Sequence, residues 1–372
     1  MKQHSKTVHI LYISSFFLML TAIGLVSAPK VPLYVSQAGG SLVKGEVASE
    51  FESLYDEGLP IRSFGMSLWA AVQYSLFKEG KSGVIIGNDD WLFSKEEFFA
   101  PEKPAYNLTR NLDTISAVAK FLEQQGVALA IAYVPAKVTI YKDKTARQVP
   151  SLFMQSLYDD GLEYLASRSP HVIDLTEPLS QLAQDSLAFF RTDTHWTPAG
   201  ASLAAKHIAQ HVENLELDLP QKEYRTQTLK SESFHGDLTR FLPLSPWFAS
   251  LMPKPDQLET HATRLFSDDE TQDNFDLFGD ENVPVVLVGT SYSANPDWNF
   301  EGALKQALGC DVMNVAVEGK GPLDPMLSYL QSEDFSEAPP KLIVWEIPVR
   351  YLPTTSPAAY MNNGRLNVTQ EG

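Results

Sequence analysis

The sequence is poor in the residues that would place the chain in several common classes of protein. Its 372 residues include one cysteine, Cys310, which excludes an internal disulfide and a zinc site built from several thiolates. Only 29 Lys and Arg residues stand against 46 Asp and Glu, a formal net charge of −17. Nucleic-acid binding needs clustered basic residues, so this balance argues against it. With 44% hydrophobic and 20% charged residues, the composition is that of a folded protein.

Long apolar runs are also missing, except for one near the N-terminus. Residues 8–27 carry no charge and follow Lys2 and Lys6, and about 20 such residues cross a bilayer. Pro29 directly follows the nearest small-residue cleavage site, which makes a removed signal peptide the less favoured alternative. Because the positive residues precede the span, the body is expected outside the cytoplasm. We therefore expect residues 1–29 to be a membrane anchor or signal and residues 30–80 a juxtamembrane linker with some helix.

The remaining chain alternates strand-length apolar runs with helical patterns, which predicts an α/β fold with a parallel sheet flanked by helices. We expect this domain to span residues 81–355, with an irregular insertion at about 216–282 and a C-terminal tail at 356–372. Strands are predicted at 127–134, 171–175, 283–289, 311–315 and 341–347, with a strand–turn–strand unit at 83–93. Helices are predicted at 108–125, 151–167, 198–212, 300–308 and 325–330.

A serine at the end of one predicted strand is the first candidate for chemistry. Ser291 lies in the segment Gly-Thr-Ser-Tyr-Ser, directly after the apolar run Val-Val-Leu-Val. Functional groups of parallel sheets gather beyond the carboxyl ends of the strands. A serine at such a turn can present its hydroxyl there, and its own N–H can face a developing oxyanion. Taken alone, such a serine is more often a turn residue or a helix cap.

An aspartate and a histidine two residues apart form the second candidate. Asp193 and His195 follow the apolar stretch 187–190, and residues i and i+2 of an extended segment project to the same side. The pair therefore fits a carboxylate that orients an imidazole base. The plainer alternative is that Asp193 caps the next helix and His195 packs beneath Trp196. Together with Ser291 the pair makes a complete triad in the order Asp, His, Ser.

These motifs together resemble the AlgX/AlgJ group of alginate O-acetyltransferases. The resemblance runs from about residue 83 to 355 and rests on four segments: Gly87–Phe93, Asp193–Gly200, Gly289–Ser293 and Trp345–Leu352. It implies an SGNH-hydrolase-like domain with a circularly permuted motif order, in which Ser291 is the nucleophile, His195 the general base and Asp193 the residue that orients it. The chain ends about 20 residues after Leu352. We therefore expect no C-terminal carbohydrate-binding module, which resembles AlgJ more than AlgX.

The resemblance also implies a function, a location and partners. The protein would attach acetyl groups to an exopolysaccharide, with alginate favoured, in the periplasm at the inner membrane. A membrane-bound O-acyltransferase would supply the acetyl group, and no cofactor or metal is implied. The net charge of −17 disfavours a polyanionic substrate, and a neutral polymer would remove that difficulty. Two alternatives stay open: an acetylesterase with the same triad, and a non-catalytic polysaccharide-binding scaffold.

Four further residues are candidates for supporting roles. Gly321 and Tyr292 could contribute to an oxyanion hole, although a plain glycine turn explains Gly321 equally well. Lys137 and Arg350 end predicted strands and could contact anionic sugars. The alternative for both is an exposed charge that aids solubility. We also expect Glu346 to pair with Arg350.

Overall fold

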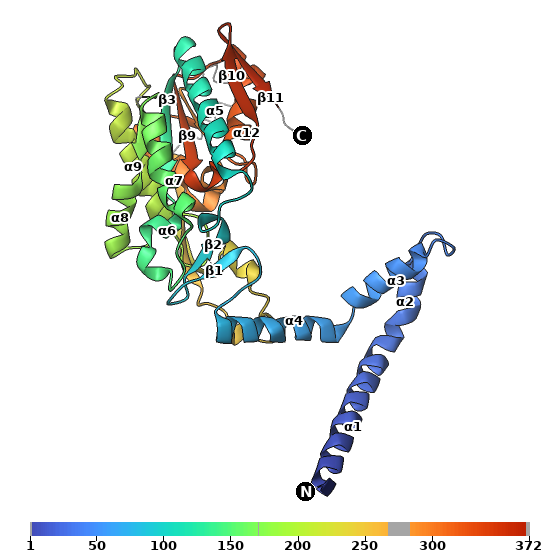
Figure 1. Ribbon diagram of the computed structural model, residues 1–372. Coiled ribbons are helices and arrows are strands. Elements are labelled where there is room, and N and C mark those ends of the chain that lie inside the picture. The colour runs from blue at the N-terminus through green and yellow to red at the C-terminus, as the bar shows by residue number, and fades with distance from the viewer. Residues whose placement is uncertain (1, 170, 267–282, 370–372) are drawn as a thin grey trace. The chain divides into compact units, whose positions relative to one another are not determined.

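The computed structural model describes residues 2–169, 171–266 and 283–369, which fall into two compact units (Figure 1). The smaller unit combines the chain up to Gly80 with Leu242–Met252, and the larger unit comprises Lys81–Phe241 and the chain from Pro253 onward. Residues 242–252 were expected to belong to the insertion of the larger domain. Instead they pack with the N-terminal part of the chain, because aromatic side chains of the two segments meet.

The smaller unit is helical. The α-helices among its described residues are α1 (Lys2–Ser27), α2 (Val31–Gln37), α3 (Glu46–Glu57) and α4 (Pro60–Val72). The segment expected as a linker with some helix is therefore mostly helix. Ile10–Gln37 forms a 28-residue helical stretch that is, by length and composition, long and apolar enough to cross a membrane. The Ser27 and Tyr55 hydroxyls, 2.7 Å apart, join this stretch to α3.

A five-stranded parallel sheet forms the centre of the larger unit, as the apolar runs predict. Its strands are ordered β4-β3-β9-β7-β8. Their bounds are β3 (Ala128–Val134), β4 (Val172–Asp174), β7 (Val285–Val288), β8 (Val312–Asn314) and β9 (Leu342–Pro348). The central pairs are in register at Val134 with Pro348 and at Val288 with Trp345. Because both faces are covered, the strands read as continuous apolar runs.

Helices cover the two faces of the sheet, and successive side chains of each strand enter different cores. In β3, Ala130 and Ala132 face one core while Ile131 and Tyr133 face the other. The first core is closed by α8 (Thr176–Asp185), α9 (Pro198–Glu213) and α11 (Phe300–Leu308). The second is closed by α5 (Pro104–Gln124), α7 (Leu152–Ala166), α12 (Leu323–Leu330) and α13 (Glu333–Glu337). In Figure 1, β3 and β9 accordingly lie between α9 and α5.

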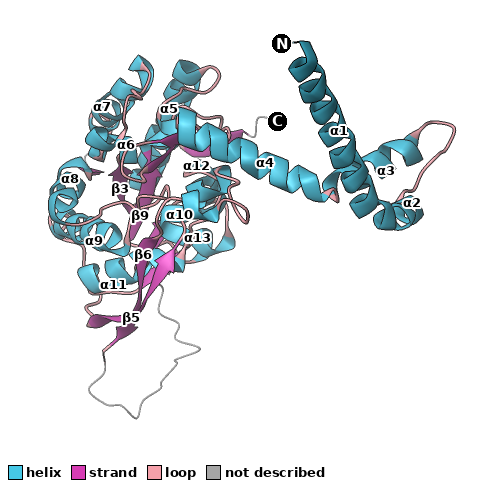
Figure 2. Cartoon of the chain, turned by 90° about the horizontal axis from the view of Figure 1, so that it is seen from below, coloured by secondary structure: helices cyan, strands magenta, loops and turns pink. Residues whose placement is uncertain are grey.

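The described residues also form three antiparallel strand pairs, and two of these pairs differ from expectation. Strands β1 (Val84–Ile86) and β2 (Leu92–Ser94) form the predicted strand–turn–strand unit. Strands β5 (Tyr224–Phe234) and β6 (Asp256–Leu265) form a long ladder inside the supposedly irregular insertion, and Figure 2 shows them side by side. Strands β10 (Ala358–Asn362) and β11 (Arg365–Thr369) form a hairpin in the supposed tail. The part of the insertion at 267–282 lies outside the described residues.

Candidate active site

The nucleophile candidate lies on a tight turn at the carboxyl end of β7. Ser291 is the first residue of the short helix α10 (Ser291–Ala294), and Thr290 caps that helix by accepting a bond from the Tyr292 N–H at 3.3 Å. The neighbouring strand β9 braces the turn through the buried carboxylate of Glu346, which accepts from the Thr290 N–H at 2.7 Å and the Ser293 hydroxyl at 3.0 Å. A Cβ on Gly289 would lie 2.4 Å from a Glu346 oxygen, so any other residue there would displace that carboxylate.

Asp193 and His195 lie on a buried loop that follows the apolar stretch 187–190, and this stretch is not a strand of the sheet. The loop closes on itself where the Phe190 N–H donates to the His195 carbonyl at 3.2 Å and the Thr197 N–H to the Ala188 carbonyl at 2.9 Å. The apolar side chains of Ala188, Phe189 and Phe190 are fully buried in the first core. The stretch therefore resembles a strand in sequence because it packs in a core, although it does not join the sheet.

The structure brings the three triad candidates together. The Ser291 Oγ lies 2.7 Å from His195 Nε2, although 96 residues separate the two in the chain. His195 Nδ1 lies 2.6 Å from Asp193 Oδ1, which also accepts from the His195 N–H at 2.8 Å. With a proton on Nδ1, the imidazole donates to the aspartate and leaves Nε2 free to accept from the serine hydroxyl.

The surroundings of Asp193 favour its charged form. Burial by itself would raise the pKa of this carboxyl. The hydrogen bond and charge of His195, with the backbone N–H groups of Asp237 and His195, outweigh burial and hold the pKa below its ordinary value. A carboxylate kept ionised in this way can stabilise the imidazolium that forms when His195 takes a proton.

Two charged side chains fix the loop that carries this pair. The Lys137 ammonium is fully buried and donates to the carbonyls of Leu92 at 2.5 Å and of Arg191 and Asp193, both at 2.9 Å. Burial lowers its pKa to about 8, while the charge of nearby Glu97 opposes the fall. Lys137 is thus neither an exposed solubilising charge nor placed to contact a sugar, because its three protons point at backbone oxygens. Asp256, at the start of β6, accepts from the Thr192 N–H at 2.8 Å and hydroxyl at 2.7 Å.

A second carboxylate lies beside the triad. Asp237 accepts from the Thr194 N–H and hydroxyl, both at 2.9 Å, and its own N–H donates to Asp193 at 2.7 Å. Burial and the charge of Asp193 raise the pKa of Asp237. Ligand-type atoms of Asp193, His195 and Asp237 lie within 4.8 Å of one another, the one grouping among the described residues that is compact enough for a metal ion. Protein donors already occupy both aspartates, however, so these contacts explain the grouping without a metal.

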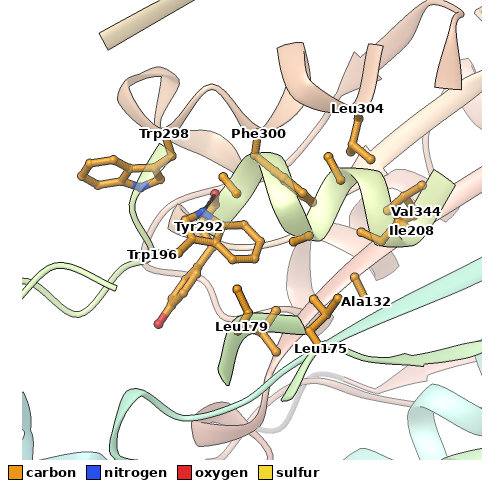
Figure 3. Packing of buried hydrophobic residues seen from close by; sticks show 14 of the residues in the cluster. Ala132, Leu175, Leu179, Trp196, Ile208, Tyr292, Trp298, Phe300, Leu304 and Val344 are labelled. Atoms are coloured by element: carbon orange, nitrogen blue, oxygen red, sulfur yellow. Dashed lines mark hydrogen bonds between the residues drawn. The ribbon is translucent and has the colours of Figure 1, made fainter. Parts of the chain in front are cut away.

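Aromatic rings form a wall behind the imidazole. The His195 ring stacks on Trp298 at a centroid distance of 5.4 Å and 28°, and approaches Tyr292 at 4.8 Å. Trp196 donates from its indole nitrogen to the Tyr292 carbonyl at 3.1 Å, and the Tyr292 hydroxyl donates to the Thr194 carbonyl at 2.6 Å. Figure 3 shows Trp196, Tyr292, Trp298 and Phe300 clustered at this end of the first core. The rings fix the imidazole plane relative to Ser291.

The triad opens into a cavity of about 800 Å³ with charges of both signs. Besides the triad, its charged lining residues are Glu96, Asp237, Arg240, Glu318 and Arg350. The cavity is therefore not a basic groove of the kind that would offset the overall negative charge. Of the two oxyanion candidates, Tyr292 has its N–H bonded to Thr290. Gly319, from the same glycine turn, lines the cavity. Gly321 is not among the described residues that line it.

Arg350 reaches the cavity wall from the end of β9. It is 6% exposed, its Cζ lies 5.4 Å from the Tyr292 ring centre, and Nη2 donates to the Tyr351 hydroxyl at 3.2 Å. Nε and Nη1 have no hydrogen-bond partner among the described residues. The expected pairing with Glu346 is wrong, because that carboxylate bonds to Thr290 and Ser293. Arg350 thus keeps a place as a candidate for contact with substrate.

Sequence reasoning missed several residues that build the site. Asp237 and Asp256 lie in the segment interpreted as irregular, where no periodicity drew attention to them. Gly236 was missed too: a Cβ there would lie 2.4 Å from the Thr192 backbone, so this glycine permits the loop to pack. A glycine next to an aspartate in a polar segment is too common a pattern to have identified them.

Comparisons with known proteins find a family model, relatives and a solved domain that are similar to this chain. The family model described as "SGNH hydrolase-like domain, acetyltransferase AlgX" matches residues 84–349. The "Probable alginate O-acetylase AlgJ" of Azotobacter vinelandii is 42% identical over 94% of this chain and 90% of its own length. The "Alginate biosynthesis protein AlgX" of the same organism is 29% identical over 74% of this chain and 57% of its own length. The solved O-acetyltransferase domain of Pseudomonas putida AlgJ is 41% identical, with a TM-score of 0.67 over 74% of this chain and 93% of that domain.

Proposed function

Because this chain belongs to the AlgX family of SGNH hydrolase-like acetyltransferases, we propose that it transfers acetyl groups onto hydroxyls of an exopolysaccharide. The observation that carries this proposal is the hydrogen-bonded chain Asp193–His195–Ser291 inside an acetyltransferase domain. Alginate is the favoured polymer, since the relatives that match nearly the whole chain are named for it.

The first half-reaction acetylates the enzyme. His195 Nε2 takes the proton of Ser291 as Oγ attacks the carbonyl carbon of an acetyl donor, and the carbonyl oxygen becomes an oxyanion. Asp193 stabilises the imidazolium at that moment. When the intermediate collapses, the bond to the donor's leaving group breaks and His195 returns the proton to it. Ser291 is left as an acetyl ester.

The second half-reaction runs the same steps with a sugar. His195 Nε2 takes the proton of a sugar hydroxyl, whose oxygen attacks the ester carbon. The bond from that carbon to Ser291 Oγ then breaks, and the proton returns to the serine. The products are an acetylated sugar and the free enzyme, so no cofactor is consumed.

A backbone donor completes the site. Ser291 is the first residue of α10, and the first N–H groups of a helix have no acceptor within it. The Ser291 N–H is therefore suited to hold the oxyanion, whereas the Tyr292 N–H is already bonded to Thr290. Arg350 is suited to contact an anionic sugar or the acetyl donor at the cavity wall.

The N-terminal helical stretch supports a proposal for the location. We propose that Ile10–Gln37 anchors the protein in the inner membrane with the catalytic unit in the periplasm. A membrane-bound O-acyltransferase is the kind of partner that would supply acetyl groups to an enzyme held at the membrane. The anchor would keep the enzyme close to that donor.

Two assays on the purified protein test the catalytic proposal. Ser291→Ala should lower cleavage of a fluorogenic acetyl ester by about 10³-fold or more, because the nucleophile is lost. His195→Ala should cost nearly as much, since triad members act as a unit, and Asp193→Asn should cost less than either. Acetylated oligosaccharide, detected by mass, reports the second half-reaction. Ser336→Ala, an exposed serine on α13, is the matched control and should retain wild-type rates.

The same assays separate the alternative functions. Wild-type turnover by Ser291→Ala in both assays would refute the nucleophile and favour a non-catalytic scaffold. Serine-dependent ester cleavage without acetylation of alginate or neutral oligosaccharides would favour an esterase.

A further inference from the structure

Helix α4 buries small residues and exposes large apolar side chains, which is the reverse of what is expected for a helix of a soluble protein. Its small residues Ser67, Ala70 and Ala71 are 4%, 9% and 5% exposed. The large side chains Phe64, Met66, Leu68 and Trp69 are 39%, 46%, 43% and 60% exposed, and Leu76 and Phe77 continue the pattern just beyond the helix. A surface helix of a soluble protein buries its large apolar side chains and exposes its polar ones. The exposed apolar side chains of α4 therefore indicate that an apolar environment outside the chain covers them.

A second segment of the same unit extends this surface. Residues 242–252 contain no charged residue, and Trp247 and Leu251 are 56% and 37% exposed. The ring of Phe64 meets Trp247 edge-on at 5.5 Å and lies 6.1 Å from Phe248. We call the exposed apolar surface formed by both segments the apolar platform; it consists of Phe64, Met66, Leu68, Trp69, Leu76, Phe77, Trp247 and Leu251.

The charges around the platform select a lipid surface as its occupant. Between Glu57 and Glu79 the chain has no acidic residue and carries Arg62 and Lys78, although the whole protein has a net charge of −17. Anionic headgroups repel carboxylates and attract Lys and Arg. Apolar side chains with tryptophan and a few basic residues are the composition of segments that lie in the membrane–water interface.

We propose that the apolar platform lies in the membrane–water interface, with its side chains among the headgroups and upper acyl chains of anionic lipids. The unit that carries the platform also contains the apolar stretch Ile10–Gln37, so both membrane contacts belong to one compact unit. This proposal rests on the proposed membrane location, but it does not depend on the catalytic assignment. It gives the protein a second membrane contact besides the spanning helix.

The tryptophans of the chain allow a direct test. The protein has six, of which Trp91, Trp196, Trp298 and Trp345 are at most 4% exposed, while Trp69 and Trp247 lie on the platform. The N-terminal stretch contains none, so anchoring by itself gives no signal. The full-length protein is reconstituted into phosphatidylcholine–phosphatidylglycerol vesicles with brominated or ordinary acyl chains. If the six residues emit equally, brominated lipid should remove up to about one third of the fluorescence, since two of six touch lipid.

Matched variants identify the source of the quenching. The double variant Trp69→Phe, Trp247→Phe should lose the bromine-dependent quenching, and Leu68→Glu should weaken it by expelling the face from the interface. Leu152→Glu, at a leucine of the larger unit that is 83% exposed, should not change it. Flotation of the vesicles checks the anchor, and acetyl ester cleavage checks the catalytic site, so either proposal can fail without the other.

Three results would overturn the lipid assignment. Iodide quenching of Trp69 and Trp247 without bromine quenching would place the platform in water. Protection from both quenchers would mean that a protein surface, such as a second copy, covers it. Bromine quenching that persists in the double variant would arise from other tryptophans.

Discussion

Replacing Glu346 by glutamine should change how the stability of the larger unit depends on pH. Burial raises the pKa of this carboxyl from 4.5 to about 7, although its bonds to Thr290 and Ser293 and the nearby His195 favour the charged form. The folded protein therefore holds the proton more tightly than the unfolded chain between about pH 4.5 and 7. Stability supplied by that proton is present below this window and is lost as the pH rises through it.

The size of the effect follows from the same pKa values. One pKa unit corresponds to about 1.4 kcal/mol, so the displacement to about 7 is worth about 3 kcal/mol. The free energy of unfolding of the wild type should thus fall by about 3 kcal/mol relative to Glu346→Gln across the window, because glutamine does not titrate. Glutamine keeps one oxygen for the Thr290 N–H, so the variant should fold.

Guanidinium unfolding of both proteins at several pH values would measure this difference. Subtracting the two curves removes the contribution of groups that titrate in both proteins. Tryptophan fluorescence is a suitable signal, since Trp345 lies next to the substituted residue and is fully buried. A difference that stays constant, or one in which the wild type gains stability with rising pH, would refute the reasoning.

Two further predictions follow from the buried lysine and the apolar N-terminal stretch. Lys137→Met should lower the free energy of unfolding by about 1–3 kcal/mol, because three carbonyls lose a charged donor. It should also lower kcat and change KM less, since two of those carbonyls belong to the loop that holds Asp193. Guanidinium unfolding and acetyl ester kinetics would measure the two effects, and unchanged values would contradict this role of Lys137. Cell fractionation should recover the full-length protein in the membrane, with the body open to protease from the periplasmic side. A soluble form that begins near Pro29 would show cleavage and contradict the anchor.

The central sheet could be predicted from sequence, whereas the parts that complete the site could not. Strands such as β3 and β9 are buried on both faces, so each leaves an unbroken apolar run. Strand β5 leaves none, because most of its residues are polar and exposed. Its partner β6 nevertheless carries Asp256, which accepts a hydrogen bond from the Thr192 N–H in the loop that holds the triad aspartate and histidine.

The same contrast holds within the site. Ser291, His195 and Asp193 belong to short motifs whose spacing carries chemistry, so they could be proposed together. The contacts of Lys137 and Glu346 depend on burial and on partners more than 40 residues away. These distant partners cannot be read from the local sequence, which is why Lys137 is predicted to contact an anionic sugar, with an exposed charge as the alternative, and Glu346 is paired with Arg350.

Because Glu346 on β9 binds Thr290 beside Ser291, catalytic activity depends on the correct pairing of β9 with β7. Glu346 follows the position where Val288 and Trp345 are in register, and its side chain alternates with the apolar residues of β9. Sliding β9 by one residue would turn this carboxylate toward the opposite core and set an isoleucine or a tryptophan beneath the turn that carries Ser291. A protein with a mispaired sheet would therefore be inactive even if it stayed compact. Specific activity per folded molecule can accordingly serve as a measure of correct assembly in refolded or mutated preparations of this protein.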